Sequence, residues 1–244
     1  MATLIFSDVH ADAPALLSVH ALLKDPAFHA YFGEIDRAVN LGDLLGRGYA
    51  PVETLAAVQQ FGQEMPLLSV VGNHDHAFLH GIPVSGSDAA SLAAHRALEG
   101  SLLLEVVRNL PEEAVLDATL FVHGGPLRAG DALTDRPFWQ RLSARAGPSC
   151  AGYHYTPGMA FAELERRGLS HLCCGHQHTP LCCQKRGEEI VPHPLILKPI
   201  PGLPLGGATV ALDAPSILRV GACCGAHPEF AVTDFFRFWF LQRW

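Results

Sequence analysis

Residues 70–76 read VVGNHDH, an apolar run that ends in glycine and then in residues able to bind a metal or move a proton. The apolar run begins near residue 66 and has the length and composition of a buried strand. Open α/β sheets place their ligands at the carboxyl ends of such strands. This stretch therefore predicts an α/β fold with a functional site at the end of a strand.

Strand and helix patterns alternate through the first half of the chain. The expected strands are 3–8, 37–43 and 66–72, and the expected helices are 14–25, 51–62, 87–100 and 101–110. Such alternation predicts a largely parallel sheet covered by helices. The second half is expected to hold a strand pair at 114–125, a helix at 158–168 and a strand at 171–178. Short apolar runs broken by Gly and Pro follow, which is typical of antiparallel strands.

The composition is that of one large globular domain, 1–244, with 49% hydrophobic and 17% charged residues. The net charge of −7, from 24 acidic and 17 basic residues, argues against binding of extended nucleic acid but not against a nucleotide-sized substrate. No signal-peptide pattern opens the chain, and no apolar run is long enough to cross a bilayer. We therefore expect a cytoplasmic protein without membrane contact.

Seven cysteines, an odd number without a signal sequence, indicate reduced thiols. They are Cys150, Cys173, Cys174, Cys182, Cys183, Cys223 and Cys224. Adjacent cysteines in a strand point to opposite faces, so each pair offers at most one thiol to a common metal. Burial as small core residues is the preferred interpretation.

Four more polar clusters follow other apolar runs, and each comes directly after the carboxyl end of an expected strand. They are Asp8-Val9-His10, Gly42-Asp43, His123-Gly124-Gly125 and Gly175-His176-Gln177-His178. At the end of an extended segment, a spacing of two residues aims both side chains to one side. A single D-x-H or H-x-H carries little weight, but five clusters after five strands predict a joint site.

These blocks resemble the calcineurin-like metallophosphoesterases, whose pattern is D-x-H, G-D, G-N-H-[DE], H and G-H-x-H. The chain carries them in order as SDVH, GDLLGRG, GNHD, VHGG and GHQH. The similarity runs from about residue 3 to about residue 236 and is closest to the small bacterial single-domain phosphatases and phosphodiesterases. The alternation and the resemblance together predict a four-layer α/β/β/α sandwich of two packed mixed sheets flanked by helices.

The resemblance implies two divalent metal ions. One would be bound by Asp8, His10, Asp43 and His178, and the other by Asp43, Asn73, His123 and His176. Two carboxylates do not neutralise two divalent cations, so the site stays positive and attracts a phosphate ester. Oxygen and nitrogen ligands without thiolate suit Mn, Fe, Zn, Co or Ni, and Mn is the first expectation.

The resemblance also implies hydrolysis of phosphate mono- or diesters. Water shared by two cations becomes a hydroxide that attacks phosphorus, and His74 would give the leaving oxygen its proton. Asp75 would hold that imidazole or its loop, and Arg47 matches a phosphate-binding arginine of the protein Ser/Thr phosphatase branch. That branch has an aspartate paired with the catalytic histidine where this chain has Gly46, which argues against a dedicated protein phosphatase.

Other functions stay open at this point. A nucleoside polyphosphate or a Ser/Thr phosphoprotein is an alternative substrate to a small phosphate ester. A non-catalytic scaffold on the same fold is a further alternative, although such scaffolds lose metal ligands or the catalytic histidine, which this chain keeps.

Two segments outside the motifs have competing interpretations. Residues 126–156 are expected to form a substrate-contacting loop insert, or else a surface excursion with a small helix of its own. The segment 234–244, DFFRFWFLQRW, reads as a final sheet strand under a helix, with Phe236 on the same face as Phe238 and Phe240. A homodimer contact through these aromatics is the alternative.

Overall fold

The computed structural model describes residues 2–149 and 152–244, so Cys150 lies outside the described residues. It contains two large mixed sheets packed face to face. The seven-stranded sheet has the order β12 (Lys198–Pro199), β13 (Leu205–Ala211), β16 (Arg237–Arg243), β15 (Glu229–Thr233), β1 (Ala2–Phe6), β2 (Ile35–Asn40) and β3 (Leu67–Ser69). The six-stranded sheet has the order β11 (Glu189–His193), β10 (Leu181–Arg186), β14 (Ser216–Arg219), β9 (His171–Cys174), β5 (Thr119–Val122) and β4 (Glu113–Leu116).

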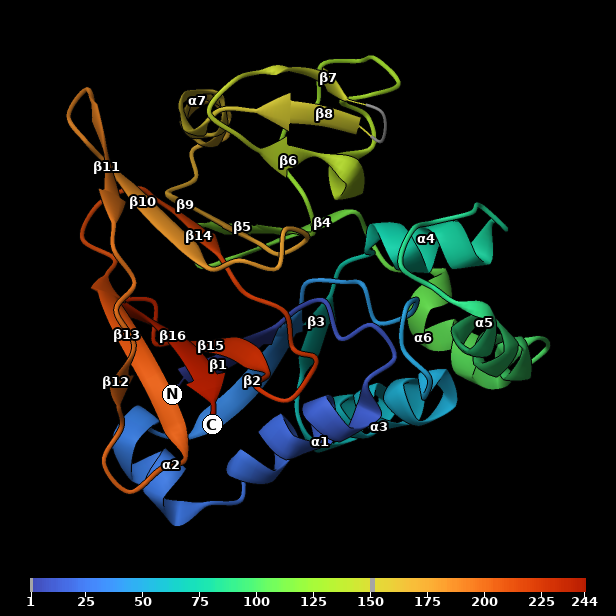
Figure 1. Cartoon of the computed structure of the whole chain (residues 1–244). Coiled ribbons are helices and arrows are strands. Elements are labelled where there is room, and N and C mark those ends of the chain that lie inside the picture. Colours follow the sequence, from blue (N-terminus) through green and yellow to red (C-terminus); the bar gives the residue numbers. More distant parts are fainter. Residues whose placement is uncertain (1, 150–151) are drawn as a thin grey trace.

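Helices cover the outer faces of the two sheets (Figure 1). The seven-stranded sheet is covered by α1 (Ala13–Leu22), α2 (Pro26–Phe32) and α3 (Pro51–Glu64). The six-stranded sheet is covered by α7 (Pro157–Arg166) together with a small sheet of β6 (Arg141–Leu142), β8 (Gly152–Tyr155) and β7 (Gly147–Ser149). The predicted four-layer sandwich is confirmed, with a small sheet added to its fourth layer.

The remaining helical elements lie in the segments that link the strands. They are α4 (Asn73–Leu79), α5 (Ala89–His95), α6 (Glu105–Arg108) and the 3-10 turns η1 (Arg96–Leu98), η2 (Leu102–Leu104) and η3 (Pro137–Trp139). None of the helices in the described residues is long and apolar enough to cross a bilayer.

Alternation along β1 explains why both faces of the central strands are apolar. Leu4 and Phe6 pack under the helices, whereas Ile5 packs against the other sheet. Each such buried side chain contributes about 1.5–3 kcal/mol relative to an exposed one. A strand buried on both faces reads as a continuous apolar run, which is why the sequence shows these strands clearly.

The final strand, β16, lies inside its sheet, and its aromatic side chains are buried on both faces. Phe238 and Phe240 enter the core between the sheets, and Trp239 packs under the helices. The predicted strand under a helix is therefore confirmed. Phe236 does not share their face, because it lies in the turn between β15 and β16 and is 80% exposed. The homodimer contact stays a prediction.

Strand directions follow the prediction only partly. β1, β2 and β3 are parallel, as expected. In the second half β14 pairs antiparallel with β10 but parallel with β9, where antiparallel strands were expected. The chain between β5 and β9, which includes α7, is long enough to return β9 parallel to β5.

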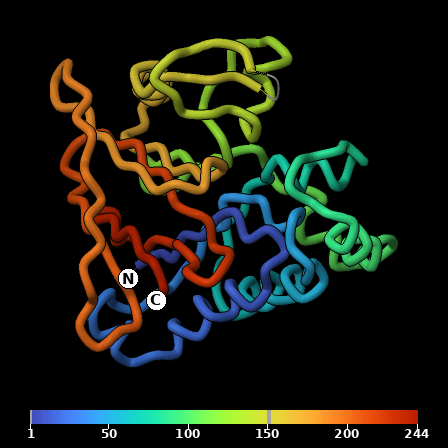
Figure 2. The backbone as a smooth tube through the Cα atoms, viewed as in Figure 1, coloured from blue at the N-terminus to red at the C-terminus, as the bar shows by residue number. Residues whose placement is uncertain are grey.

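Several predicted helices differ from those observed. The helices expected at 87–100 and 101–110 are broken into short α and 3-10 turns, with Gly100 at a φ of 73° between them. The segment 126–156 holds η3 and all three strands of the small sheet, and the helix expected within it is only a 3-10 turn. In Figure 2 this green-to-yellow segment forms a lobe at the top of the view, over the six-stranded sheet.

Cysteine pairs behave as the strand geometry requires. Cys173 and Cys182 point into the core between the sheets, whereas Cys174 and Cys183 point into the core under α7. Burial raises the pKa of these thiols, to about 11 at Cys174 and Cys183. Buried, protonated thiols fit a packing role.

Candidate metal centre

Five loops, each after a strand, bring the predicted ligands to one edge of the sandwich. These loops follow β1, β2 and β3 in one sheet and β5 and β9 in the other. Side chains in them form three groups whose ligand atoms lie within 4.8 Å of one another. The groups are Asp8–His10–His178, His10–Asp43–His74 and Asp43–His123–His176. Shared members join the three into one cluster.

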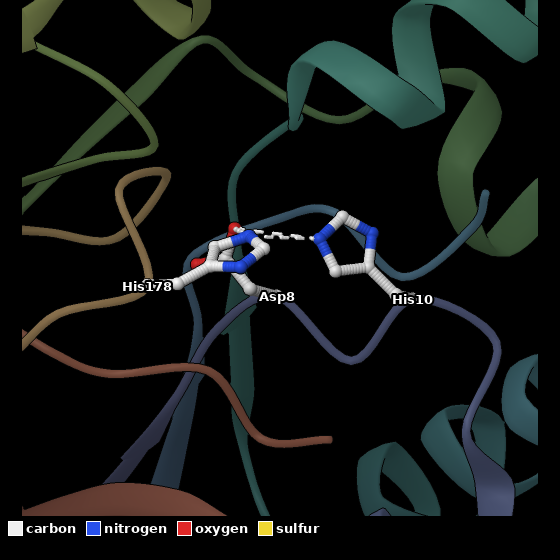
Figure 3. Close-up of side chains that lie close together, drawn as sticks. All are labelled: Asp8, His10 and His178. Atoms are coloured by element: carbon white, nitrogen blue, oxygen red, sulfur yellow. Dashed lines mark hydrogen bonds and ion pairs between the residues drawn. The ribbon is translucent and has the colours of Figure 1, made fainter. Parts of the chain in front are cut away.

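The outer group consists of Asp8, His10 and His178. The Nε2 atoms of His10 and His178 lie 3.0 Å apart, and Nε2 of His178 lies 3.2 Å from Oδ1 of Asp8. Figure 3 shows the two rings, from loops far apart in the sequence, turned toward each other beside this carboxylate. The His178 side chain is 29% exposed, so the outer group reaches the surface.

The inner group consists of Asp43, Asn73, His123 and His176, all buried. Nε2 of His123 is its centre. This atom lies 3.0 Å from Oδ1 of Asn73, 3.3 Å from Oδ2 of Asp43 and 3.2 Å from Nδ1 of His176. Oδ2 of Asp43 also lies 3.9 Å from Nε2 of His10, so Asp43 stands between the two groups.

Backbone carbonyls fix which histidine nitrogens face inward. Nδ1 of His123 donates to the Leu41 carbonyl at 2.8 Å, and Nδ1 of His10 donates to the Leu45 carbonyl at 3.3 Å. A carbonyl only accepts, so the proton of each neutral ring is on Nδ1 and the Nε2 lone pair faces the cluster. This is the orientation in which proteins hold metal-binding imidazoles.

The charges of the cluster favour a cation. Burial tends to raise the pKa of Asp8, but the hydrogen bond with His178 and the charge of His123 outweigh burial and lower the pKa to about 2. Burial likewise opposes ionisation of Asp43, and His123 overcomes it and holds the pKa well below its usual range. Two buried carboxylates are thus ionised among converging lone pairs.

The surroundings of the donor atoms also suit a metal ion. Oδ1 of Asp8 is buried and faces two imidazole nitrogens, Nε2 of His178 at 3.2 Å and Nε2 of His10 at 3.9 Å, and no backbone donor of the described residues bonds to it. Without a cation, His123 compensates by holding a proton, because Asp43 outweighs burial and raises its pKa to about 9. The oxygen and imidazole set suits a first-row divalent ion.

The loops hold the ligands in a strained backbone. Five of the seven predicted ligands have φ between 50° and 66°, a region that costs energy for residues other than glycine. They are Asp8, His10, Asp43, His176 and His178. Oδ2 of Asp8 offsets part of this cost by accepting from the Ser7 hydroxyl at 2.6 Å and the His176 amide at 2.9 Å. Strain concentrated in this way is typical of a functional site.

Asp75 organises the loops rather than the imidazole of His74. Its Oδ2 accepts from the amides of Asp43 at 2.8 Å and Gly72 at 3.1 Å, and its Oδ1 accepts from Leu45 at 3.0 Å. Burial, reinforced by the charge of Asp43, raises the pKa of Asp75 to about 7. Of the two expected roles, the contacts correspond to holding the loop.

Gly46 explains the departure from the protein phosphatase pattern. Its φ is 82°, and a Cβ at this position would overlap Nδ1 of His74. An aspartate therefore does not fit here, and Nδ1 of His74 has no hydrogen-bond partner among the described residues. The Gly46 amide instead donates to Nε2 of His95 at 2.9 Å. His95 carried no signal in the sequence beyond its place in a helical pattern.

Two arginines lie near the cluster from different segments. Arg47 lines a cavity of about 420 Å³ together with His10, His178 and Tyr49. Arg141, in β6, is close enough to add to the effects of burial and His123 that lower the pKa of His176. The sequence singled out Arg47 by motif and Arg141 only as part of the segment 126–156.

Comparisons with known proteins give one consistent result. The sequence profile described as "Calcineurin-like phosphoesterase" matches residues 1–180. A metallophosphoesterase from Sphaerobacter thermophilus has a similar structure, with a TM-score of 0.66 and 23% identity over 100% of this chain and 88% of that one. No curated protein matches at a significant level.

Two further solved structures share the fold at lower identity. A hypothetical protein from Pyrococcus horikoshii OT3 has a TM-score of 0.60 and 14% identity over 96% of this chain and 83% of that one. A putative diadenosine tetraphosphatase has a TM-score of 0.54 and 16% identity over 100% of this chain and 94% of that one. At these identities the likeness concerns the fold alone.

Proposed function

The chain belongs to the calcineurin-like phosphoesterase family, and on that premise we propose that it is a dinuclear metal-dependent hydrolase of phosphate mono- or diesters. The observation that carries the proposal is the position of Asp43 between two groups of inward-facing ligand atoms. One carboxylate shared by two sets of donors suits two cations about 3.5–4 Å apart. Mn is the first candidate, and Fe, Zn, Co and Ni suit the same donors.

Two bound divalent ions would supply a hydroxide nucleophile near neutral pH and offset the negative charge of the phosphate. The chain's own residues have the remaining tasks. Arg47 and Arg141 would bind the phosphate oxygens and orient the ester. Exposure of His178 and the adjoining cavity provide room for the rest of the substrate.

His74 is the proposed proton donor to the leaving oxygen. Its ring meets that of His10 edge-on, with 4.8 Å between the centroids, which places it against the cluster. Its amide donates to Oδ1 of Asp43 at 2.8 Å, so the carboxylate shared by the two groups also fixes the backbone of His74. Burial lowers the pKa of His74, and the protonated ring is then a stronger acid.

Metal analysis combined with turnover of p-nitrophenyl phosphate and bis-p-nitrophenyl phosphate tests the proposal. We expect about two metal equivalents per chain and hydrolysis of at least one ester, abolished by chelation. A chain that binds two metals without turnover would favour the scaffold alternative, and one that binds none would contradict the proposal. A panel of nucleotides, sugar phosphates and phosphopeptides then separates small esters from nucleoside polyphosphates and phosphoproteins.

A further inference from the structure

The turn that carries His176 and His178 is joined to the small sheet by the side chain between them. Oε1 of Gln177 accepts from the Leu142 amide at 2.8 Å, and Nε2 of Gln177 donates to the Leu142 carbonyl at 3.1 Å. Residues exchange this same pair of bonds across an antiparallel ladder. The carboxamide therefore takes the place of a neighbouring strand on the free edge of β6.

The geometry of β6 makes this contact specific to Leu142. The other side of the strand faces β8, where the Ser143 amide donates to the Tyr155 carbonyl at 2.8 Å. Successive residues of a strand direct their backbone groups to opposite sides, so Leu142 is the residue of this pair whose groups face Gln177. Leu142 is buried, and loss of the carboxamide would leave its donor and acceptor without partners.

The rest of the small sheet is tied to the same region. The Tyr155 hydroxyl donates to the Gly124 carbonyl at 2.9 Å, next to His123. Arg141 precedes Leu142, so the residue that Gln177 holds is adjacent to the arginine whose charge acts on His176. The position of Arg141 along the edge thus depends on where Gln177 holds β6.

We propose that Gln177 is a positioning residue that docks the small sheet β6–β8–β7 onto the turn bearing His176 and His178 and so places Arg141 to bind the phosphate of the substrate. The inference rests on the proposed function. Gln177 itself needs no contact with substrate or metal. Its effect on phosphate binding is exerted through Arg141.

A double-mutant cycle of Gln177→Ala and Arg141→Ala tests the coupling. The readouts are the affinity of the Mn-loaded protein for inorganic phosphate by calorimetry, the metal content, and amide hydrogen exchange in the metal-free protein. Each single change is expected to weaken phosphate binding about 10- to 100-fold, the range for residues that support a site from outside. The double variant should be no weaker than the weaker single variant, because both remove the same contact.

In Gln177→Ala, amide exchange of the metal-free protein should rise at residues 141–143, and metal analysis of the Mn-loaded protein should still find two metals per chain. The matched control is Gln184→Ala, which also removes a carboxamide bonded to a backbone carbonyl, that of Ala211, but in β10 away from the site. It is expected to leave phosphate affinity and exchange at 141–143 unchanged. Gln177→Glu keeps the acceptor and loses the donor, so its effect should fall between wild type and Gln177→Ala.

Additive losses in the double variant, or unchanged phosphate affinity in Gln177→Ala, would overturn the proposal. Loss of a metal from Gln177→Ala would also overturn it, in favour of support for the ligands themselves. If the wild-type protein binds no metal, the proposed function fails, and the exchange data still decide whether Gln177 docks the sheet.

Discussion

The outer and inner groups of the candidate centre have similar donors but different surroundings. The outer group opens through His178 to a cavity of about 420 Å³, whereas every member of the inner group is buried. Its central imidazole is held by the carbonyl of Leu41. A buried, preorganised set of ligands should hold its cation more firmly than a set with one exposed member. We therefore expect the inner cation to dissociate slowly. The outer cation should exchange with solvent more readily and be the first to contact substrate.

Asp43→Asn should have the largest effect, because it removes the carboxylate common to both groups. Asparagine keeps the shape and can still accept from the His74 amide, so the fold should survive. Loss of several kcal/mol of charge stabilisation corresponds to a fall in kcat/KM of about 10³-fold or more. Metal content measured after dialysis should fall for both groups; full retention of either cation would show that Asp43 is not shared.

His74→Ala should separate chemistry from metal binding. We expect turnover to fall about 10²-fold or more, the usual contribution of a general acid, with two metals retained. Asn73→Ala is the matched neighbour, and it should weaken the inner cation instead. Wild-type turnover in His74→Ala would show that another group protonates the leaving oxygen.

His176→Ala and His178→Ala compare the two groups directly in the metal-free protein. The buried His176 leaves a cavity when truncated, so unfolding should become easier by about 1–3 kcal/mol. For the partly exposed His178 the change should be within about 0.5 kcal/mol. Urea unfolding in the presence of chelator measures both, and equal losses would contradict the distinction between open and closed surroundings.

The pH dependence of metal-free stability should also differ between the groups. The pKa of His123 is raised from 6.5 to about 9, so the stability it contributes is complete below pH 6.5 and is lost as the pH rises through about 9. The pKa of Asp8 is lowered from 3.8 to about 2, so its contribution is present above pH 3.8 and is lost as the pH falls toward 2. Unfolding curves across this range should show both losses, and Asp43→Asn should remove most of the alkaline one.

Sequence patterns were most informative where a local run of residues determines the structure. The five motif blocks lie at strand ends on one edge, as predicted, because carboxyl ends of parallel strands must coincide. The fold class followed from the alternation of strands and helices. Asp75 was placed next to the site by motif, although its contacts with loop amides could not be read from the motif.

Contacts between distant segments were not predictable. Gln177 meets Leu142 across 35 residues, and His95 meets Gly46 across 49, with no local pattern that encodes either pairing. The small sheet was hidden because its strands are two to four residues long, too short for a periodic signal. α4 was missed because its first turn is the motif itself, which reads as a loop.

Anomalous diffraction from crystals grown with manganese tests the central claim most directly. The account predicts two manganese peaks about 3.5–4 Å apart on either side of Asp43. One should be bound by Asp8, His10 and His178, and the other by Asn73, His123 and His176. An empty cluster at saturating manganese, or peaks that do not share Asp43, would contradict it.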